Sequence, residues 1–313
     1  MCKEKFDLEK EISTEVENFK NIIKGDFNKY IDKNFNKMEG LEQKKIVTEA
    51  LYAGYLDTCR TVKWKDKTEN DRKPIVEQIF KDSDVVDQIT KFMKNGVLGK
   101  TDKERQDNFD AIHFELCTAM KEEFEKKCIT FTYGQTQKII NMAFKYLYCI
   151  DGIDKECFRS CHMPLDSFTL EWIYKACLED PEKMQGIKIG KGISVREQGK
   201  FVKKEAIGTW SSMLYENTSP NTEDKCTYKF YLNLLRKNFS NECLLKMDFY
   251  IWPRMQKILA AEEFIKAFND GGNKKFTNLK DEDNSYHAYQ LANLETTLQK
   301  KLQSVINIIY AKK

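Results

Sequence analysis

The spacing of apolar residues, in a chain with few helix breakers, most strongly limits what this sequence can fold into. Between Lys103 and Lys127, apolar side chains recur every three or four residues, the period of one face of an α-helix. These residues are Phe109, Ile112, Leu116, Met120 and Phe124. The 313 residues include only 14 glycines and 5 prolines, and the abundant Lys, Glu, Leu and Ile are residues compatible with helices. The sequence therefore predicts a mainly α-helical protein.

The length of the chain fits either one large domain or two ordinary ones. We expect two closely packed helical lobes, residues 1–130 and residues 131–313. Within the second lobe, residues 184–209 break the helical pattern with alternating apolar residues and glycines, which predicts a small β excursion or a long loop. A final helix is expected at about residues 285–310.

Two prolines mark positions where a helix is expected to begin or bend. Pro74 follows a polar run from Lys63 to Lys73, which we interpret as a loop that the proline closes. Pro253 lies within a helical pattern that extends from Leu244 to Ala267. Because proline lacks a backbone N–H, Pro253 either starts a helix or kinks one.

The charge of the chain allows a nucleic-acid partner without requiring one. The 52 basic and 49 acidic residues give a formal net charge of +3, and binding of nucleic acid needs a local basic patch. Lysines and one arginine gather among glycines between Gly186 and Lys204. They could contact phosphates, and the alternative is a solvated loop.

The ten cysteines and the hydropathy of the chain indicate where it works. With no secretory leader expected, the cysteines predict free thiols in a reducing cytosol, hence a cytoplasmic protein. No apolar run approaches the roughly 20 residues of a membrane span. Cys157 and Cys161 only loosely match the paired spacing of zinc ligands. We therefore expect buried thiols, with no metal or cofactor.

The residues with the clearest chemistry are Lys138 and Asp166. Lys138 lies near the start of a helix expected from Thr136 to Cys149, and Asp166 precedes one expected from Ser167 to Leu178. An amine nucleophile and a carboxylate partner are the minimum for Schiff-base chemistry at a sugar carbon. We therefore expect the two side chains to face a common cleft.

A structural alternative explains the same residues without catalysis. Gln135, Lys138, Asn141 and Lys145 could form a solvated helix face, beside a strongly apolar stripe on the same helix. Asp166 could serve only as the N-cap of the helix that begins at Ser167, since aspartate is a preferred N-cap residue.

Residues 132–167 also carry a family resemblance. Gly134 lies four residues before Lys138, and the segment ends in Met163-Pro164-Leu165-Asp166-Ser167. This pattern resembles the helix-hairpin-helix base-excision DNA glycosylase superfamily, in particular its archaeal 8-oxoguanine DNA glycosylase branch. Thr136 stands where the family has a second hairpin glycine. The resemblance implies that Lys138 attacks the sugar carbon bearing a damaged base, while Asp166 stabilises the cationic sugar.

The resemblance also implies a DNA partner and a flipped-out target base. The residues that we expect to bind the substrate are Gly134, Gln135, Asn141, Lys145, His162, Trp172 and Trp210. A second hypothesis is a non-catalytic helical protein of a microbial defence or regulatory system. In that case the same polar helix face binds a nucleotide, a nucleic acid or a protein. The two hypotheses differ in whether the Lys138 amine is needed.

Overall fold

The computed structural model describes residues 7–23, 25–62, 64, 69–96, 99–177, 194–197, 200–203, 210–216, 227–239 and 242–269. This part of the chain is mainly helical, which confirms the fold class expected from the sequence. The helix expected at about residues 285–310 lies outside the described residues, as does most of the basic segment from Gly186 to Lys204.

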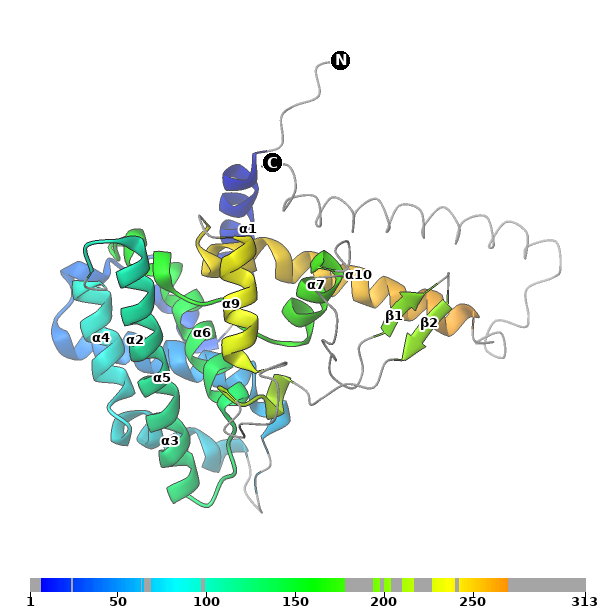
Figure 1. Ribbon diagram of the computed structural model, residues 1–313. Coiled ribbons are helices and arrows are strands. Elements are labelled where there is room, and N and C mark those ends of the chain that lie inside the picture. Colours follow the sequence, from blue (N-terminus) through cyan, green and yellow to red (C-terminus); the bar gives the residue numbers. More distant parts are fainter. Residues whose placement is uncertain are drawn as a thin grey trace.

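Helices and short 3₁₀ turns follow one another through the first half of the chain (Figure 1). In order, they are α1 (Leu8–Ile22), η1 (Gly25–Tyr30), η2 (Phe35–Lys37), α2 (Gly40–Leu56), η3 (Cys59–Thr61), α3 (Glu69–Asp82), α4 (Val85–Asn95) and α5 (Asp102–Lys126). The helix expected from Lys103 to Lys127 is thus present as α5. Its N-terminus is closed by a capping box between Thr101 and Glu104, an arrangement that satisfies two backbone N–H groups.

The second half begins with the segment that carries the candidate chemistry. Its elements are α6 (Tyr133–Tyr148), η4 (Lys155–Ser160), α7 (Ser167–Cys177), β1 (Ser194–Glu197), β2 (Lys200–Lys203), η5 (Trp210–Ser212), α9 (Tyr228–Asn238) and α10 (Leu244–Asn269). Strands β1 and β2 pair antiparallel, with Ser194 opposite Lys203. They form a small hairpin where the sequence predicts a β excursion or loop.

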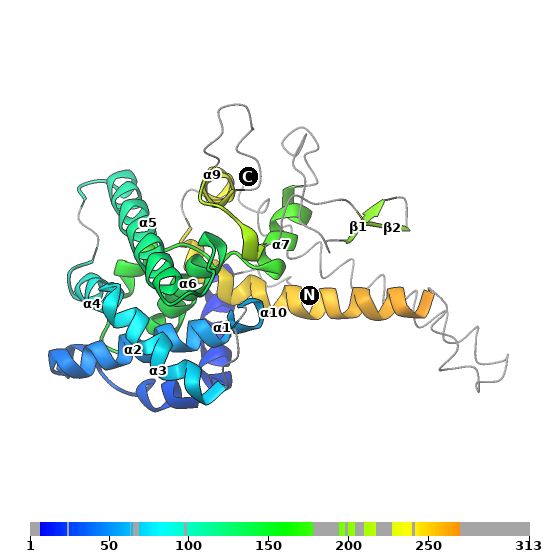
Figure 2. The ribbon, with the colours of Figure 1, turned by 90° about the horizontal axis from the view of Figure 1, so that it is seen from below.

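Helix α6 lies at the centre of the packed helices, against α2 and α5. The approach of α2 is close, since a Cβ atom on Gly54 would lie 2.5 Å from the carbonyl oxygen of Ile139. Glycine at this position lets the two backbones approach. Helix α10 packs against α1 and α7, and its far end extends away from the other helices (Figure 2).

One hydrophobic core runs through the described helices. It joins side chains such as Ile46 and Phe109, before residue 130, to Ile139, Trp172 and Met255 after it. Residues on both sides of the boundary expected at residue 130 contribute to this core. The division into two lobes at that residue stays a prediction.

The two prolines lie inside helices. The loop expected up to Lys73 is wrong at its end, because α3 already begins at Glu69 and includes Pro74. A proline so near the start of a helix removes only one backbone hydrogen bond, to the carbonyl of residue 70, and the helix persists. Pro253 lies within α10, so of the two alternatives it does not start the helix. Among the described residues, no helix combines the length and apolar character that a membrane crossing requires.

Candidate functional site

Residues 133–136, which the family resemblance places at a hairpin, form the first turn of α6. Thr132 is its N-cap and accepts a hydrogen bond from the Gln135 backbone N–H, while the Gln135 side chain accepts from the backbone N–H of Thr132. This capping box starts the helix at Tyr133, three residues earlier than expected. The Gln135 amide also donates to the carbonyl of Thr61 at 2.9 Å. Gln135 therefore ties the helix start to η3.

The N-terminus of α6 is covered by η5. The backbone N–H of Gly134 donates to the carbonyl of Met213 at 2.9 Å, and a Cβ on Gly134 would lie 1.9 Å from the carbonyl oxygen of Trp210. The glycine is thus needed for close packing against η5. Because this N–H group is already bonded within the protein, the described structure does not present Gly134 to a phosphate.

The polar face of α6 is buried. The exposed fraction of the side chains and backbone is 4% for Gln135, 7% for Lys138, 0% for Asn141 and 2% for Lys145. The alternative that these residues form a solvated face is therefore wrong. A buried polar group needs partners inside the protein, and each of these residues has them.

Two amides of α6 hold the segment that leads to Asp166. Gln137 accepts from the backbone N–H of Leu165 at 3.2 Å and donates to its carbonyl at 2.8 Å, as a neighbouring strand would. Asn141 donates to the carbonyl of Met163 at 3.3 Å. These contacts fix the backbone before Asp166 against α6. Gln137 is a site residue that the sequence analysis missed, since its partner is a main-chain group 28 residues away.

The structure brings Lys138 and Asp166 into direct contact. Lys138 Nζ lies 3.2 Å from Asp166 Oδ2, and both side chains are almost fully buried. Asp166 Oδ1 accepts from the backbone N–H groups of Phe168 at 2.9 Å and Thr169 at 3.2 Å. Asp166 is therefore both the N-cap of α7 and the ion-pair partner of Lys138. Its role in catalysis stays a prediction.

Two partly exposed indoles flank this ion pair. Lys138 Nζ lies 4.6 Å from the ring centroid of Trp210, within the range of a cation–π contact. The Trp252 indole N–H donates to Asp166 Oδ2 at 3.3 Å. Trp210 was expected at the site from the sequence, and Trp252 was not. The one feature of the sequence that marks Trp252 is its position directly before Pro253, inside a helical pattern.

Comparisons with known proteins were made for the whole chain. No protein-family model, curated protein or solved structure matches it. The case for any function therefore depends on the residues of this chain and on how they contact one another.

A second buried lysine pairs with a second aspartate two turns further along α6. Lys145 Nζ lies 2.6 Å from Asp248 Oδ2 on α10, and both side chains are at most 2% exposed. The rings of Phe19 and Phe249 each lie 4.8 Å from Lys145 Nζ. Burial raises the pKa of Asp248 despite the opposing effect of Lys145. Lys145 is thus enclosed by the fold, and presents no surface to a substrate.

Asp57, at the C-terminal end of α2, adds a third carboxylate to this region. Tyr146 donates its hydroxyl to Asp57 Oδ2 at 3.0 Å. Burial raises the pKa of Asp57, while the Tyr146 hydrogen bond and the charges of Lys138 and Lys145 act in the opposite direction. Three carboxylates therefore interact with two lysines around α6, which makes the region acidic when all five groups are charged.

His162 belongs to a buried hydrogen-bond network next to the ion pairs. Its Nδ1 lies 2.9 Å from the Tyr228 hydroxyl and its Nε2 lies 2.8 Å from Asp110 Oδ1. Tyr228 accepts a hydrogen bond from Asn141, whose Oδ1 lies 2.9 Å from His113 Nε2. The network thus joins α5, α6 and α9. His162 and Asn141 are at most 1% exposed, so both serve the fold and offer no surface to a substrate.

Asp110 ends the hydrogen-bond network of His162, and Trp172 belongs to the hydrophobic core. The Asp110 carboxylate is held between His162 and Arg236. Burial by itself would raise the pKa of Asp110, but the hydrogen bonds from His162 and Arg236 lower it. Trp172 is 1% exposed and stacks on Phe239 with ring centroids 5.3 Å apart. It is a core residue that lacks the free face a base would stack on.

We expect the two buried histidines to make the protein less stable as the pH is lowered from 7.5 to 5.5. Burial lowers the pKa of both His113 and His162, so the unfolded chain binds protons below its pKa of about 6.5 while the folded protein does not. The free energy of unfolding then rises with pH in this window, by up to about 1.4 kcal/mol per pH unit per histidine. Denaturant unfolding at three pH values measures how the free energy of unfolding changes with pH.

The variant His113→Gln provides the matched comparison. It keeps a polar side chain beside Asn141 and removes one titrating group, so the slope of stability against pH should become shallower. An unchanged slope in a folded His113→Gln protein would show that the buried imidazole does not cause the dependence.

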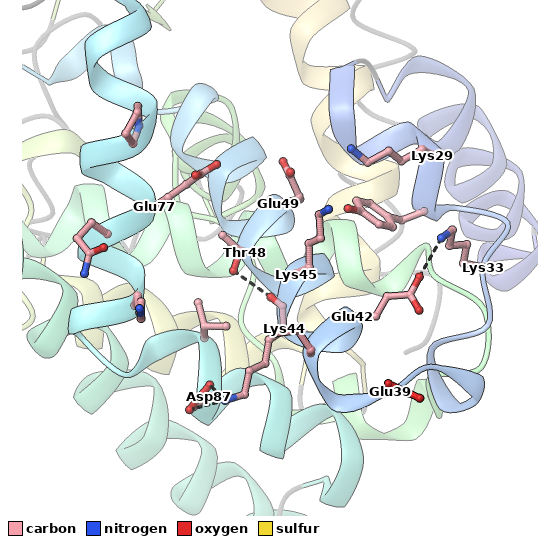
Figure 3. A pocket seen from close by; sticks show the side chains of 16 residues that line it. Lys29, Lys33, Glu39, Glu42, Lys44, Lys45, Thr48, Glu49, Glu77 and Asp87 are labelled. Carbon is pink, nitrogen blue, oxygen red and sulfur yellow. Dashed lines mark hydrogen bonds and ion pairs between the residues drawn. The ribbon is translucent and has the colours of Figure 1, made fainter.

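A groove with a volume of about 1260 Å³ lies on another face, between α2, α3, α4 and η1 (Figure 3). None of the residues that line it belongs to the Lys138 and Asp166 region. Five lysines and five acidic residues line it, and Lys33 pairs with Glu42 at 2.9 Å and Lys44 with Asp87 at 2.7 Å. The formal charges of the lining residues therefore balance.

The described cysteines are free thiols. Burial raises the pKa of Cys149 and of Cys157 to about 12, which keeps both thiols protonated and unreactive at neutral pH. Within the described ranges, no group of three or more His, Cys, Asp or Glu side chains is placed to hold a metal ion.

Proposed function

We propose that the protein is a nucleic-acid-directed enzyme of the lysine-and-aspartate glycosylase type, which acts on a damaged base in DNA. One observation carries the proposal: Lys138 Nζ lies 3.2 Å from Asp166 Oδ2, in an arrangement fixed from both sides. Gln137 clamps the backbone of Leu165, and Asp166 is anchored on the first amides of α7. Such pre-organisation is what a catalytic pair requires.

In the proposed reaction, the neutral amine of Lys138 attacks C1′ of the nucleotide. The N–C1′ bond forms as the bond from C1′ to the base breaks, and the base leaves with the electron pair and takes up a proton. Loss of a proton from the attached nitrogen and opening of the sugar, with O4′ protonated, gives an imine. Water hydrolyses the imine and restores the amine. Asp166 stabilises the positive charge that develops on the sugar, and accepts the proton that Lys138 must lose before it attacks.

The flanking indoles support a nucleic-acid substrate. Trp210 lies directly over Lys138 and remains partly exposed. An aromatic face beside the nucleophile could stack on an extruded base, and stacking of this kind tolerates different bases. Of the residues expected to bind substrate, Trp210 is the one whose position in the structure best suits that role.

The Lys145 and Asp248 pair favours the second candidate, a non-catalytic binding protein. That pair shows that this chain uses a buried lysine and aspartate to join two helices, and Asp166 has a structural role as an N-cap. In this candidate the Lys138 pair joins α6 to α7. The polar face of α6, expected from the sequence to bind the ligand, is buried, so the ligand is recognised elsewhere on the protein.

Borohydride trapping distinguishes the two candidates. The protein is incubated with duplexes that contain an abasic site or 8-oxoguanine, in the presence of borohydride, which reduces the imine to a stable amine. We expect a covalent adduct that peptide mass spectrometry maps to Lys138 and that disappears in Lys138→Gln. The control is Lys81→Gln, an exposed lysine on α3, which should keep the adduct. If the native protein traps no duplex across a panel of lesions, the binding-protein candidate is favoured.

A further inference from the structure

Trp252 donates a hydrogen bond to the same carboxylate oxygen that contacts the candidate nucleophile. Its Nε1 lies 3.3 Å from Asp166 Oδ2, and Lys138 Nζ lies 3.2 Å from that oxygen. Asp166 Oδ1 is occupied by the backbone of α7. Asp166 Oδ2 is therefore shared between one neutral donor, the Trp252 indole, and one charged donor, the Lys138 ammonium.

The orientation of the Trp252 ring is set by residues from three helices. Phe168, two residues after Asp166, meets the indole edge to face, with ring centroids 5.7 Å apart and planes at 80°. Lys145 Nζ lies 5.7 Å from the centroid of the indole and is itself held by Asp248, one turn before Trp252 on α10. Trp252 thus connects the buried Lys145 and Asp248 pair to the Lys138 and Asp166 pair.

We infer that Trp252 is a positioning residue that weakens the hold of Asp166 on the Lys138 ammonium and so makes the amine available to react. A carboxylate oxygen that accepts a second hydrogen bond has less negative charge to offer the first donor. Without the indole N–H, Asp166 Oδ2 would hold Lys138 Nζ more tightly, and the amine would be released to react less often. The role of Trp252 in catalysis rests on the proposed function, whereas its effect on Lys138 does not.

The test measures the reactivity of Lys138 directly, without DNA. Formaldehyde and dimethylamine borane methylate neutral amines, and peptide mass spectrometry gives the rate at Lys138 relative to the exposed Lys81 of the same molecule. We expect Trp252→Phe, which keeps an aromatic ring and removes the N–H donor, to slow methylation of Lys138 by about two- to fourfold, because losing one hydrogen bond strengthens its neighbour by only a fraction of the energy of a hydrogen bond to a charged group. Lys145 should remain unmodified in every folded variant.

Two further proteins make the result specific. Trp64→Phe is the matched control, because it also removes one indole hydrogen bond, from Trp64 Nε1 to the Tyr55 hydroxyl at 2.8 Å, whose acceptor is not part of the Lys138 and Asp166 pair. It should leave the Lys138 rate unchanged. Benzothienylalanine at position 252 replaces the indole N–H with sulfur in a ring of the same shape. It should slow methylation as Trp252→Phe does, and it keeps the test valid if the phenylalanine variant fails to fold.

The outcomes separate this inference from the proposed function. An unchanged or faster methylation of Lys138 in the folded Trp252 variants overturns the inference, whatever happens with DNA. If methylation slows and trapping of an abasic duplex slows in parallel, both proposals are supported. If methylation slows but the native protein traps no duplex, the glycosylase proposal fails and the role of Trp252 toward Lys138 stands.

Discussion

Replacing Lys145 with methionine should destabilise the protein by about 3–5 kcal/mol, because it leaves the buried Asp248 carboxylate without its cation. Asp248 is fully buried, its Oδ2 contacts Lys145 at 2.6 Å, and its Oδ1 has no hydrogen-bond partner within the described structure. Methionine fills a similar volume and should pack among the surrounding rings. Denaturant unfolding at pH 7.5 measures the loss.

The pH dependence of that loss gives a second check. Burial already raises the pKa of Asp248, and removal of Lys145 takes away the main effect that opposes it. A carboxyl group whose pKa is higher in the folded state than in the unfolded state destabilises the fold as the pH rises. The difference in the free energy of unfolding between Lys145→Met and the native protein should therefore shrink when the pH is lowered from 7.5 to 5.5.

Two comparisons show whether the effect comes from the buried charge. Lys145→Met combined with Asp248→Asn removes both charges and should recover much of the lost stability. Lys44→Met breaks the ion pair between Lys44 and Asp87, in which both side chains are about half exposed. This variant should lose less than about 1 kcal/mol of stability. Similar losses in Lys44→Met and Lys145→Met would contradict a special cost of burial.

Replacing Asp166 with asparagine should reduce formation of the borohydride-trapped adduct by at least about 100-fold, if the proposed function holds. Asparagine retains an oxygen that can accept from the N–H groups of Phe168 and Thr169, so the cap of α7 is preserved. It lacks the charge that stabilises the sugar cation and accepts the proton of Lys138. The reaction should therefore suffer far more than α7 does.

The controls for this prediction separate charge from capping. Asp7 caps α1 through the N–H groups of Glu9 and Lys10, so Asp7→Asn makes the same chemical change at a helix start away from the pair. It should trap at the native rate. Asp166→Asn should remain folded by circular dichroism at the assay temperature, with a lower melting temperature because Lys138 loses its ionic partner. If Asp166→Asn traps DNA at the native rate, Asp166 serves only as a helix cap.

The local parts of the structure could be predicted from the sequence, because they depend on residues close together in the chain. The apolar period from Phe109 to Phe124 is enough to place α5. The approach of Lys138 to Asp166, which are 28 residues apart, was expected from the chemistry of the pair and its place at two helix starts, and local spacing alone does not imply it. The first turn of α6 was placed too late, because the capping box between Thr132 and Gln135 was not recognised.

The burial of the polar face of α6 could not be predicted, because the groups that satisfy it lie far along the chain. Tyr228, which bonds Asn141, is 87 residues away, and Asp248, which pairs with Lys145, is 103 residues away. A lysine on a helix looks the same in a sequence whether its partner is water or a distant aspartate. Only the packing of α9 and α10 decides which it is.

The distance along the chain between Lys145 and Asp248 also has a consequence during translation. Protein synthesis proceeds at about 5–20 residues per second, so roughly 5–20 seconds separate the emergence of the lysine from that of its aspartate. Through that interval α6 carries an ammonium group that no apolar interior can enclose without great cost. We therefore expect the end of α6 that carries Lys145 to stay hydrated until α10 leaves the ribosome, so that this part of the central helix is among the last to be enclosed.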